Sequence, residues 1–318
     1  MSLGSAGVLG LREVRMDAPP TTAYLMLGER CSRNCAFCTQ ARESQADADA
    51  LSRVSWPAFP AGAVIEAAAG AHRQGRIGRV CFQVTVSPGY LDQARQAVAQ
   101  LSSRCAAPIC ASVAPRAEDD VAALLDAGAE RVTIALDAAC ERVYRDAKGG
   151  SWAQTTALLE TCAQRFPGRI GTHLIAGLGE TERELVERMQ WAHDLGVTIG
   201  LFAFTPVAGA AWAARQPPPL DSYRRAQTAR WLIVYDLARA EHWRYDMGDA
   251  LIGFGVAALQ LRAWLAGGDA FRTAGCAACN RPYYNERPGG VMYNYPRPLT
   301  PPEAEAEVAA LLGALQWP

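Results

Sequence analysis

The sequence predicts an α/β fold, a (β/α)8 TIM-type barrel that is either closed or partial and open, followed by an irregular C-terminal extension. Two observations lead to this fold class. Short apolar, β-branched runs alternate with segments of helical period along most of the 318 residues, and eight of these runs qualify as strands. Repeated strand–helix alternation favours parallel strands with helices outside them. We expect an N-terminal extension at 1–20, a barrel at 21–275 and a C-terminal extension at 276–318.

The elements follow one another in a regular order. The strand candidates are 23–28, 79–85, 108–113, 131–137, 170–175 and 198–204, with two weaker ones at 243–247 and 270–273. The helix candidates are 61–75, 91–103, 117–127, 152–165, 181–195, 221–240 and 256–265, and a short helix is expected at 302–315. Long irregular segments at 29–56 and 275–301 interrupt the pattern.

Composition excludes several classes of protein. The chain has 31 basic and 32 acidic residues and a net charge of −1, which argues against binding nucleic acid through bulk positive charge. Its apolar stretches are too short to span a bilayer, and residues 1–11 lack the basic and apolar regions of an export signal. We therefore expect a cytoplasmic protein without a membrane partner. Ten cysteines in a reducing cytosol then need a reason other than disulfides.

Three of these cysteines form a compact motif directly after the first strand candidate. Cys31, Cys35 and Cys38 have the spacing CxxxCxxC. Thiolates this close together can converge on a soft metal, either an iron–sulfur cluster or zinc. A cubane normally takes four ligands, so three leave one iron open to a small molecule. A structural zinc site would need a near fourth ligand, yet the next cysteine is Cys81. A zinc site and three buried free cysteines remain the alternatives.

The motif, with the aromatic Phe37 before its last cysteine, resembles the signature of the radical S-adenosylmethionine (SAM) superfamily. The resemblance implies that Cys31, Cys35 and Cys38 hold a [4Fe–4S] cluster whose fourth iron binds SAM. It also implies that electron transfer from the cluster yields a 5′-deoxyadenosyl radical, which abstracts a hydrogen atom. The expected position of the motif suits this chemistry, because barrel enzymes build their sites at the C-terminal ends of strands.

Three further residues are candidates for contact with this cofactor, and each has a plainer alternative. Gly177, in the segment 174–181, resembles the part of biotin synthase-like members that packs near adenine, although it could simply form a tight turn. Asp137 resembles an acid that contacts ribose hydroxyls in biotin synthases, and its alternative is a helix N-cap. Lys148 could pair with the carboxylate of the cofactor or be a solvated loop lysine.

A second metal site is suggested by Cys276 and Cys279, a CxxC pair after the eighth strand candidate. In a closed barrel this pair would face the same mouth as the first motif. It could be half of an iron–sulfur site, half of a zinc site or a redox pair. By resemblance to biotin synthase, Cys81 and Cys110 match two ligands of a sulfur-donor cluster. Gly171 stands where that enzyme has a third cysteine, and Arg244 matches its cluster arginine.

The stretch 271–296 resembles the C-terminal signature of two-component lipoyl synthases. This resemblance implies a sulfurtransferase that inserts sulfur from a second iron–sulfur cluster into octanoyl-lysine. The implied partners are a lipoyl carrier domain or glycine-cleavage H protein, a companion radical SAM subunit, and an electron donor such as ferredoxin or flavodoxin. The alternatives are a biotin synthase-like or other radical enzyme acting on a small free substrate, and a structural or electron-transfer iron–sulfur protein.

Overall fold

A parallel sheet of six strands, curled into a half-barrel, forms the centre of the molecule. The computed structural model describes residues 1–286 and 289–317. Within them the sheet has the order β1-β4-β5-β6-β7-β8, and every neighbouring pair is parallel. The strands are β1 (Thr22–Leu27), β4 (Arg79–Val84), β5 (Ile109–Val113), β6 (Arg131–Ile134), β7 (Ile170–Ala176) and β8 (Thr198–Ala203). The fold is thus the partial, open form of the expected barrel.

The two weak strand candidates do not join this sheet. Residues 243–247 contribute only β9 (Arg244–Tyr245), which pairs antiparallel with β10 (Leu251–Gly253). Residues 270–273 begin in a 3-10 helix, η2 (Asp269–Phe271), whose fully buried Phe271 belongs to the main core. The expectation of eight barrel strands was therefore wrong: these short apolar runs are buried by packing beyond the sheet, not by pairing within it.

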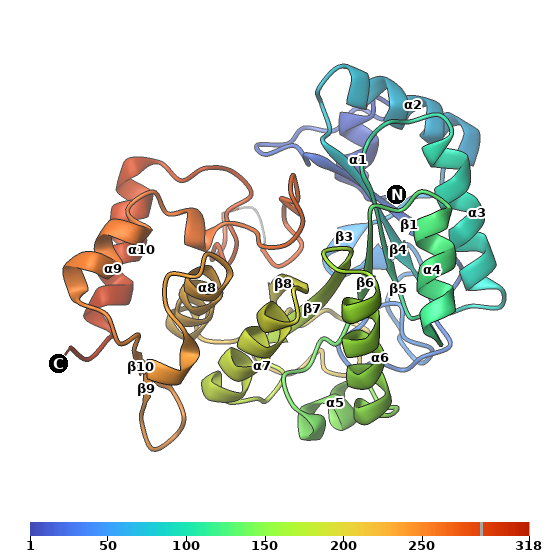
Figure 1. The fold of residues 1–318 in the computed structure, drawn as a ribbon. Helices are drawn as coiled ribbons and strands as arrows, with labels where there is room; N and C mark the ends of the chain where they lie inside the picture. Colours follow the sequence, from blue (N-terminus) through green and yellow to red (C-terminus); the bar gives the residue numbers. More distant parts are fainter. Residues whose placement is uncertain (287–288, 318) are drawn as a thin grey trace.

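Helices cover the outer face of the sheet, as the alternation predicts. They are α2 (Ala61–Arg73), α3 (Tyr90–Ser102), α4 (Glu118–Asp126), α5 (Glu141–Ala147), α6 (Trp152–Arg165) and α7 (Glu182–Asp194). A second group, α8 (Leu220–Val234), α9 (Ala258–Leu265) and α10 (Pro301–Gly313), lies beyond β8 on the other side of the molecule (Figure 1). The helices α1 (Leu3–Val8) and α5, and the hairpin of β2 (Ala50–Leu51) and β3 (Val54–Ser55), were not predicted.

The C-terminal segment after η2 crosses the open side of the half-barrel (Figure 1). Its Ala278 carbonyl accepts hydrogen bonds from the hydroxyls of Thr21 and Thr22 at the start of β1. Further along, the ring of Tyr284 packs on those of Tyr24 and Trp56, with centroids 5.5 and 6.1 Å away. These contacts shield the inside of the half-barrel, which two further strands would cover in a closed barrel.

Side chains alternate between the two faces of each strand, as strand geometry requires. On β4, Val80 and Phe82 are buried in the core shared with the outer helices, whereas Cys81 and Gln83 face inward and line a cavity. The inner face is thus unusually polar for a barrel interior, which is normally filled with branched apolar side chains.

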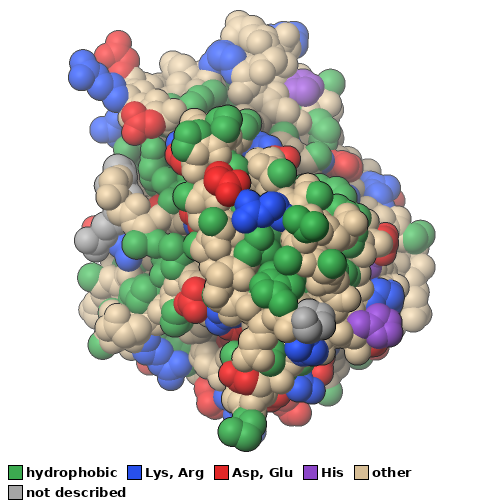
Figure 2. Space-filling view, turned by 90° about the vertical axis from the view of Figure 1, so that its left-hand side faces the viewer, with side chains coloured by type: hydrophobic (Ala, Val, Ile, Leu, Met, Phe, Trp, Pro, Cys, Tyr) green, Lys and Arg blue, Asp and Glu red, His purple; other side chains and the backbone are tan. Residues whose placement is uncertain are grey.

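One face of the molecule shows no single dominant charge. The face that carries the C-terminal helices mixes hydrophobic side chains with charged ones of both signs (Figure 2). Among the described residues, no helix has the length and the hydropathy that crossing a bilayer would need.

Candidate active site

The CxxxCxxC motif lies on a loop at the C-terminal end of β1, called here the motif loop (residues 29–46). The guanidinium of Arg30 organises this loop from inside, since it donates to the carbonyls of Ser44 and Ala46, both at 2.9 Å. The backbone N–H of Ala36 donates to the carbonyl of Ala147 at 2.7 Å, which ties the loop to the end of α5. The three motif cysteines are free thiols and half-buried.

The motif loop has the donor chemistry that an iron–sulfur cluster requires. Burial raises the pKa of Cys35 to about 11 and that of Cys38 to about 12, so both thiols are protonated at neutral pH until a metal displaces their protons. Among residues 1–286 and 289–317, no three or more His, Cys, Asp or Glu side chains are grouped closely enough to bind a single metal ion. This spread is compatible with a polynuclear cluster, whose cysteines each bind a different iron.

One cavity of about 200 Å³ runs through the half-barrel beneath the motif loop. Phe37 and Cys38 lie at its C-terminal end, together with Asp137, Ile175 and Phe204. Its walls are the inward-facing residues of the strands, and its far end contains Cys81, Cys110, Cys276 and Cys279. One cavity therefore reaches from Cys38 of the motif loop to the four cysteines at its far end, while Cys31 lines a neighbouring pocket together with Lys148.

Two of the predicted cofactor contacts, Asp137 and Lys148, bind each other. Lys148 Nζ lies 2.7 Å from Asp137 Oδ2, and their side chains are only 8% and 12% exposed. Lys148 also donates to the carbonyl of Ala135. Lys148 is thus not the solvated loop lysine of the plainer alternative. Nor is Asp137 a helix N-cap, because Cys140 occupies that position of α5.

Asp137 holds a backbone conformation that is uncommon outside glycine. Its φ is +67°, and its N–H and C=O continue the ladder with β7 through His173 O at 2.7 Å and Ile175 N at 2.8 Å. Left-handed residues of this kind persist where the surroundings enforce them, and they cluster at functional sites. The conformation lets Asp137 line the cavity just past the end of β6.

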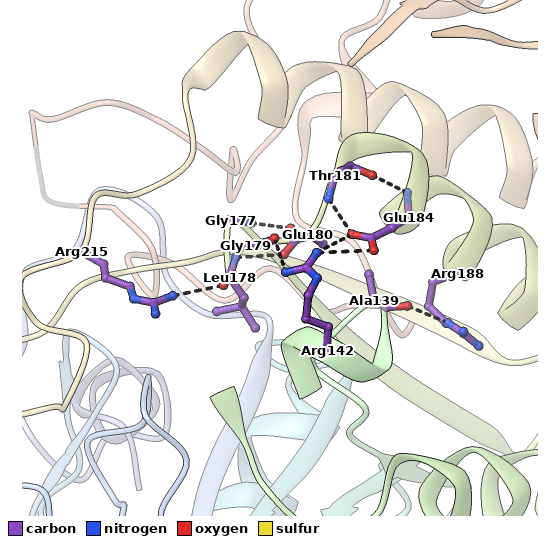
Figure 3. Close-up of polar contacts among 10 residues, drawn as sticks. All are labelled: Ala139, Arg142, Gly177, Leu178, Gly179, Glu180, Thr181, Glu184, Arg188 and Arg215. Atoms are coloured by element: carbon purple, nitrogen blue, oxygen red, sulfur yellow. Dashed lines mark hydrogen bonds and ion pairs between the residues drawn. The ribbon is translucent and has the colours of Figure 1, made fainter. Parts of the chain in front are cut away.

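Gly177 begins the turn between β7 and α7. Its φ is +96°, and a Cβ at this position would lie only 2.8 Å from Pro218, so both the conformation and the space require glycine. The carboxylate of Glu180 accepts hydrogen bonds from the N–H groups of Gly177 and Leu178 at 2.6 and 3.0 Å. Figure 3 shows these bonds together with the Thr181–Glu184 capping box that starts α7. Gly177 thus forms a tight turn and does not line the cavity, and its contact with adenine stays a prediction.

The four cysteines at the far end of the cavity come from three separate segments, and we call them the basal cysteines (Cys81, Cys110, Cys276, Cys279). Cys81 on β4 and Cys110 on β5 are partners in the sheet register, and Tyr24 on β1 continues the same row. The Sγ atoms of Cys110 and Cys276 are 3.4 Å apart. A hydrogen bond from Cys110 lowers the pKa of Cys276, and the same bond raises the pKa of Cys110.

The basal cysteines lie at the N-terminal end of the strands, so the expectation that both cysteine sites face the same mouth was wrong. Without an eighth strand, the chain after η2 returns to the start of the sheet, where Arg79 at the beginning of β4 donates to the carbonyl of Ala277 at 3.0 Å. Arg244 is also not near the basal cysteines: it is exposed on β9 and bonds to the carbonyl of Gln316.

Several residues of this site were missed in the sequence. Arg79 donates to Cys110 Sγ at 3.0 Å and pairs with Glu130, while Arg281 donates to Cys279 Sγ at 3.3 Å. His173 lines the cavity, and burial lowers its pKa to about 4, so it is neutral at pH 7. One signal pointed to Arg79 and His173: polar residues alternate with apolar ones in strands that would otherwise read as continuous apolar runs. Arg281 lies outside the strands, so this signal does not extend to it.

Comparison with solved structures supports the fold. The FeFe-hydrogenase maturase HydG from Carboxydothermus hydrogenoformans is similar with a TM-score of 0.53 and 15% identity, over 68% of this chain and 51% of that protein. The chain thus spans about half the length of HydG. Methylornithine synthase (PylB) is similar with a TM-score of 0.53 and 11% identity, over 73% of this chain and 67% of that one. Such low identities show the fold alone.

The family itself is identified at the level of sequence. A comparison with curated protein sequences finds no significant match. The family model described as the Radical SAM superfamily, however, matches residues 25–192, which is more than half of the chain and includes the whole motif loop. The chain therefore belongs to the radical SAM superfamily, whose domain implies a [4Fe–4S] cluster and SAM.

Proposed function

We propose that this protein is a radical SAM sulfurtransferase that inserts sulfur into an unactivated C–H bond of octanoyl-lysine on a lipoyl carrier domain. One observation carries the proposal: a single cavity is lined at one end by Phe37 and Cys38 of the CxxxCxxC motif and at the other end by four further cysteines. A radical enzyme that transfers sulfur needs a place to generate the radical and a place to hold the sulfur, with the substrate carbon between them.

At the first place, Cys31, Cys35 and Cys38 hold the [4Fe–4S] cluster. Bound there with SAM, the cluster supplies an alkyl radical able to abstract a hydrogen atom that no acid–base group could remove. The protein positions and shields this chemistry. Phe37 forms part of the cavity wall beside Cys38, and the buried pair of Asp137 and Lys148 offers a carboxylate and an ammonium for the polar groups of the cofactor.

At the second place, Cys276 and Cys279 hold an iron–sulfur cluster that serves as the sulfur donor, with Cys81 and Cys110 as the further ligands. Four thiols reach this end of the cavity, which is the number that a cubane takes. This set replaces the biotin synthase-like arrangement, in which Gly171 leaves one position without a thiol.

The cavity wall suits an acyl chain. Leu51, Ile175, Phe202 and Phe204 contribute apolar surface between the two cysteine groups. Apolar walls exclude water, which would otherwise compete for reactive species. A carrier domain or glycine-cleavage H protein would present the octanoyl-lysine, a companion radical SAM subunit would insert the other sulfur, and ferredoxin or flavodoxin would supply electrons.

The test uses the full chain, reconstituted anaerobically with iron and sulfide, reduced, and mixed with SAM and an octanoyl-lysine peptide. We expect about eight irons per chain, formation of 5′-deoxyadenosine, and a gain of sulfur in the peptide by mass spectrometry. About four irons would contradict the second cluster. Cofactor cleavage that never leads to sulfur gain would favour an enzyme of a small free substrate. A full cluster that never cleaves SAM would favour the structural or electron-transfer alternative.

Paired variants connect the sulfur transfer to the basal cysteines. The double variant C276A/C279A should abolish sulfur gain while SAM cleavage continues, because the motif loop is untouched. Cys105→Ala is the matched control, since Cys105 is a buried thiol that lies outside the cavity. Sulfur transfer that survives in C276A/C279A would overturn the assignment of the donor.

A further inference from the structure

The sulfur atoms of the motif loop and those of the basal cysteines have different hydrogen-bond donors. At the motif loop they are approached by backbone N–H groups, with Val86 N 3.4 Å from Cys31 Sγ. At the basal cysteines they are approached by side chains. Gln83 Nε2 lies 3.1 Å from Cys81, Arg79 Nη1 lies 3.0 Å from Cys110, and Arg281 Nη1 lies 3.3 Å from Cys279. Two of these three donors carry a full positive charge.

The two arginines are not equivalent. Arg79 also pairs with the carboxylate of Glu130, which offsets its charge. Within the described part of the chain Arg281 forms no ion pair with a carboxylate: besides Cys279, its guanidinium donates to the carbonyls of Ala274 at 2.6 Å and Leu201 at 3.5 Å. It also lies over the ring of Phe202, 4.0 Å from the centroid. The guanidinium of Arg281 therefore faces the sulfur of Cys279, and none of these contacts is with a carboxylate that would offset its positive charge.

The backbone around Arg281 is built to hold this position. Arg281 has φ +33°, and Ala278 and Tyr283 on the same segment have φ +64°. Non-glycine residues in this region are held there by their surroundings, and such strain is typical of functional sites. Space for the guanidinium comes from Gly275, where a Cβ would lie 3.3 Å from Arg281 Nη1. The fold thus maintains an unfavourable backbone conformation that directs the guanidinium of Arg281 toward Cys279 Sγ.

Tyr24 provides a second, neutral donor to the same sulfur. Its Oη accepts the backbone N–H groups of Asn280 at 3.2 Å and Arg281 at 2.9 Å. With its oxygen occupied by two donors, the hydroxyl hydrogen is free to be donated, and Cys279 Sγ lies 3.4 Å away. Cys279 is therefore the basal cysteine that receives both a charged and a neutral hydrogen bond.

We propose that Arg281, assisted by Tyr24, is a positioning residue that sets the reduction potential of the centre held by the basal cysteines above that of the centre held by the motif loop. This inference rests on the proposed function, because it requires a second iron–sulfur cluster. Net charge and hydrogen bonds to the sulfurs are the main means by which a protein tunes such a potential. A nearby cation stabilises the more negative, reduced state, and partial burial in the cavity wall strengthens the effect. The second centre is thereby the electron acceptor of the pair.

The experiment is an anaerobic redox titration of the reconstituted full chain, followed by electron paramagnetic resonance, in wild type, Arg281→Gln, Arg281→Lys and Tyr24→Phe. We expect two one-electron transitions in wild type. Arg281→Gln should lower the equilibrium constant for reduction of the second centre at least tenfold, a shift of 59 mV to the negative. The centre of the motif loop is an internal reference and should not move. Arg281→Lys keeps the charge and should shift less than Arg281→Gln.

Two further variants test whether the shift comes from the hydrogen bonds to Cys279 and not from a general change in the fold. Tyr24→Phe keeps the ring that packs on Tyr284 and removes only the hydroxyl, so it should shift the second centre in the same direction by a smaller amount even if Arg281→Gln fails to fold. Arg230→Gln is the control, because Arg230 is a half-buried arginine that donates to the carbonyl of Ile199 and, among the described residues, forms no hydrogen bond to a cysteine. It should move neither centre.

The outcomes separate this inference from the function on which it rests. A chain with about four irons and a single transition would overturn both the second cluster and the role of Arg281. Two transitions, with the second unmoved in Arg281→Gln and Tyr24→Phe, would overturn the role of Arg281 alone. Equal shifts in both centres, or the same shift in Arg230→Gln, would show a general structural effect and would also overturn it.

Discussion

The two cysteine groups at the ends of the cavity are built in opposite ways. The three cysteines of the motif loop lie within eight consecutive residues, on a loop that Arg30 and backbone contacts hold in shape. The four basal cysteines come from β4, β5 and the C-terminal segment, and they meet only because the sheet register and the returning chain bring them together. The first group is a local motif, and the second is a product of the whole fold.

The electrostatic surroundings of the two cysteine groups also differ. Burial raises the pKa of Cys35 and Cys38, and Lys148 nearby is paired with Asp137. Among the basal cysteines, hydrogen bonding from Cys110 lowers the pKa of Cys276, and arginine side chains face the sulfurs. The comparison teaches that one cavity can hold two thiol-rich centres of different character, because each centre takes its properties from its immediate donors.

The largest effect is expected when the motif loop loses a thiol. Cys38→Ala should reduce 5′-deoxyadenosine formation to below detection and lower the iron content from about eight to about four per chain, since the remaining two thiols cannot retain the cluster. Both quantities are measured on the same anaerobic preparation. Cys105→Ala should match wild type. Persistent SAM cleavage in Cys38→Ala would mean that the site for radical generation lies elsewhere.

The mirror experiment removes one basal thiol. Cys110→Ser should lower the iron content by a similar amount, to about four per chain, and stop sulfur transfer, while 5′-deoxyadenosine still forms within a few-fold of wild type. The reason is that the two groups lie at opposite ends of the cavity and share no ligand. A parallel loss of cofactor cleavage in Cys110→Ser would show that the two centres are not independent, and the comparison drawn above would fail.

The next effect concerns the ion pair beside the motif loop. Asp137→Asn leaves Lys148 buried without its counterion, so the free energy of unfolding should fall by about 3–5 kcal/mol. Urea unfolding of the metal-free chain under reductant measures this change. The double variant D137N/K148M should regain part of the loss, since it buries no unpaired charge. If Asp137→Asn lowers stability by less than about 1 kcal/mol, the pair is not the buried one described here.

The smallest effect involves His173, on the wall between the two groups. Burial lowers its pKa to about 4 in the folded state, while the unfolded value is near 6.5. Between these values the unfolded chain binds more protons, so stability should decline as the pH falls from 6.5 towards 4, by about 3 kcal/mol. His173→Gln should flatten this part of the stability profile measured by urea unfolding. His242→Gln, at an exposed position, should leave it as in wild type.

The same contrast explains which parts of the fold could be predicted. The first six strand candidates are all strands of the sheet, and the helices between them agree within a few residues, because hydrophobic period and capping residues act locally. The predicted helix at 221–240 ends earlier, at Val234, where Asp236 adopts a left-handed backbone with φ +53°. The seventh and eighth strand predictions were wrong because the hydrophobicity of a short segment does not show whether it is buried by pairing in a sheet or by packing elsewhere.

The candidate site likewise has residues that could be predicted from the sequence and residues that could not. Cys31, Cys35, Cys38 and Phe37 could be singled out from spacing alone, since all of the relevant information lies within one loop. Asp137 and Lys148 were identified separately, and only the structure brings their side chains into contact. Arg281 could not be found at all, because nothing in the residues around it shows that its guanidinium will reach a cysteine.

By itself, then, the sequence determined the parallel α/β architecture, the motif loop and the superfamily, because each depends on periodicity or on residues within a few positions of one another. Only the tertiary structure decided that the barrel stays half open, that the basal cysteines gather at the N-terminal end of the strands, and that arginines face them. These features depend on strand register and on the path of the chain after η2, and such long-range contacts are settled by packing over the entire molecule rather than by local preference.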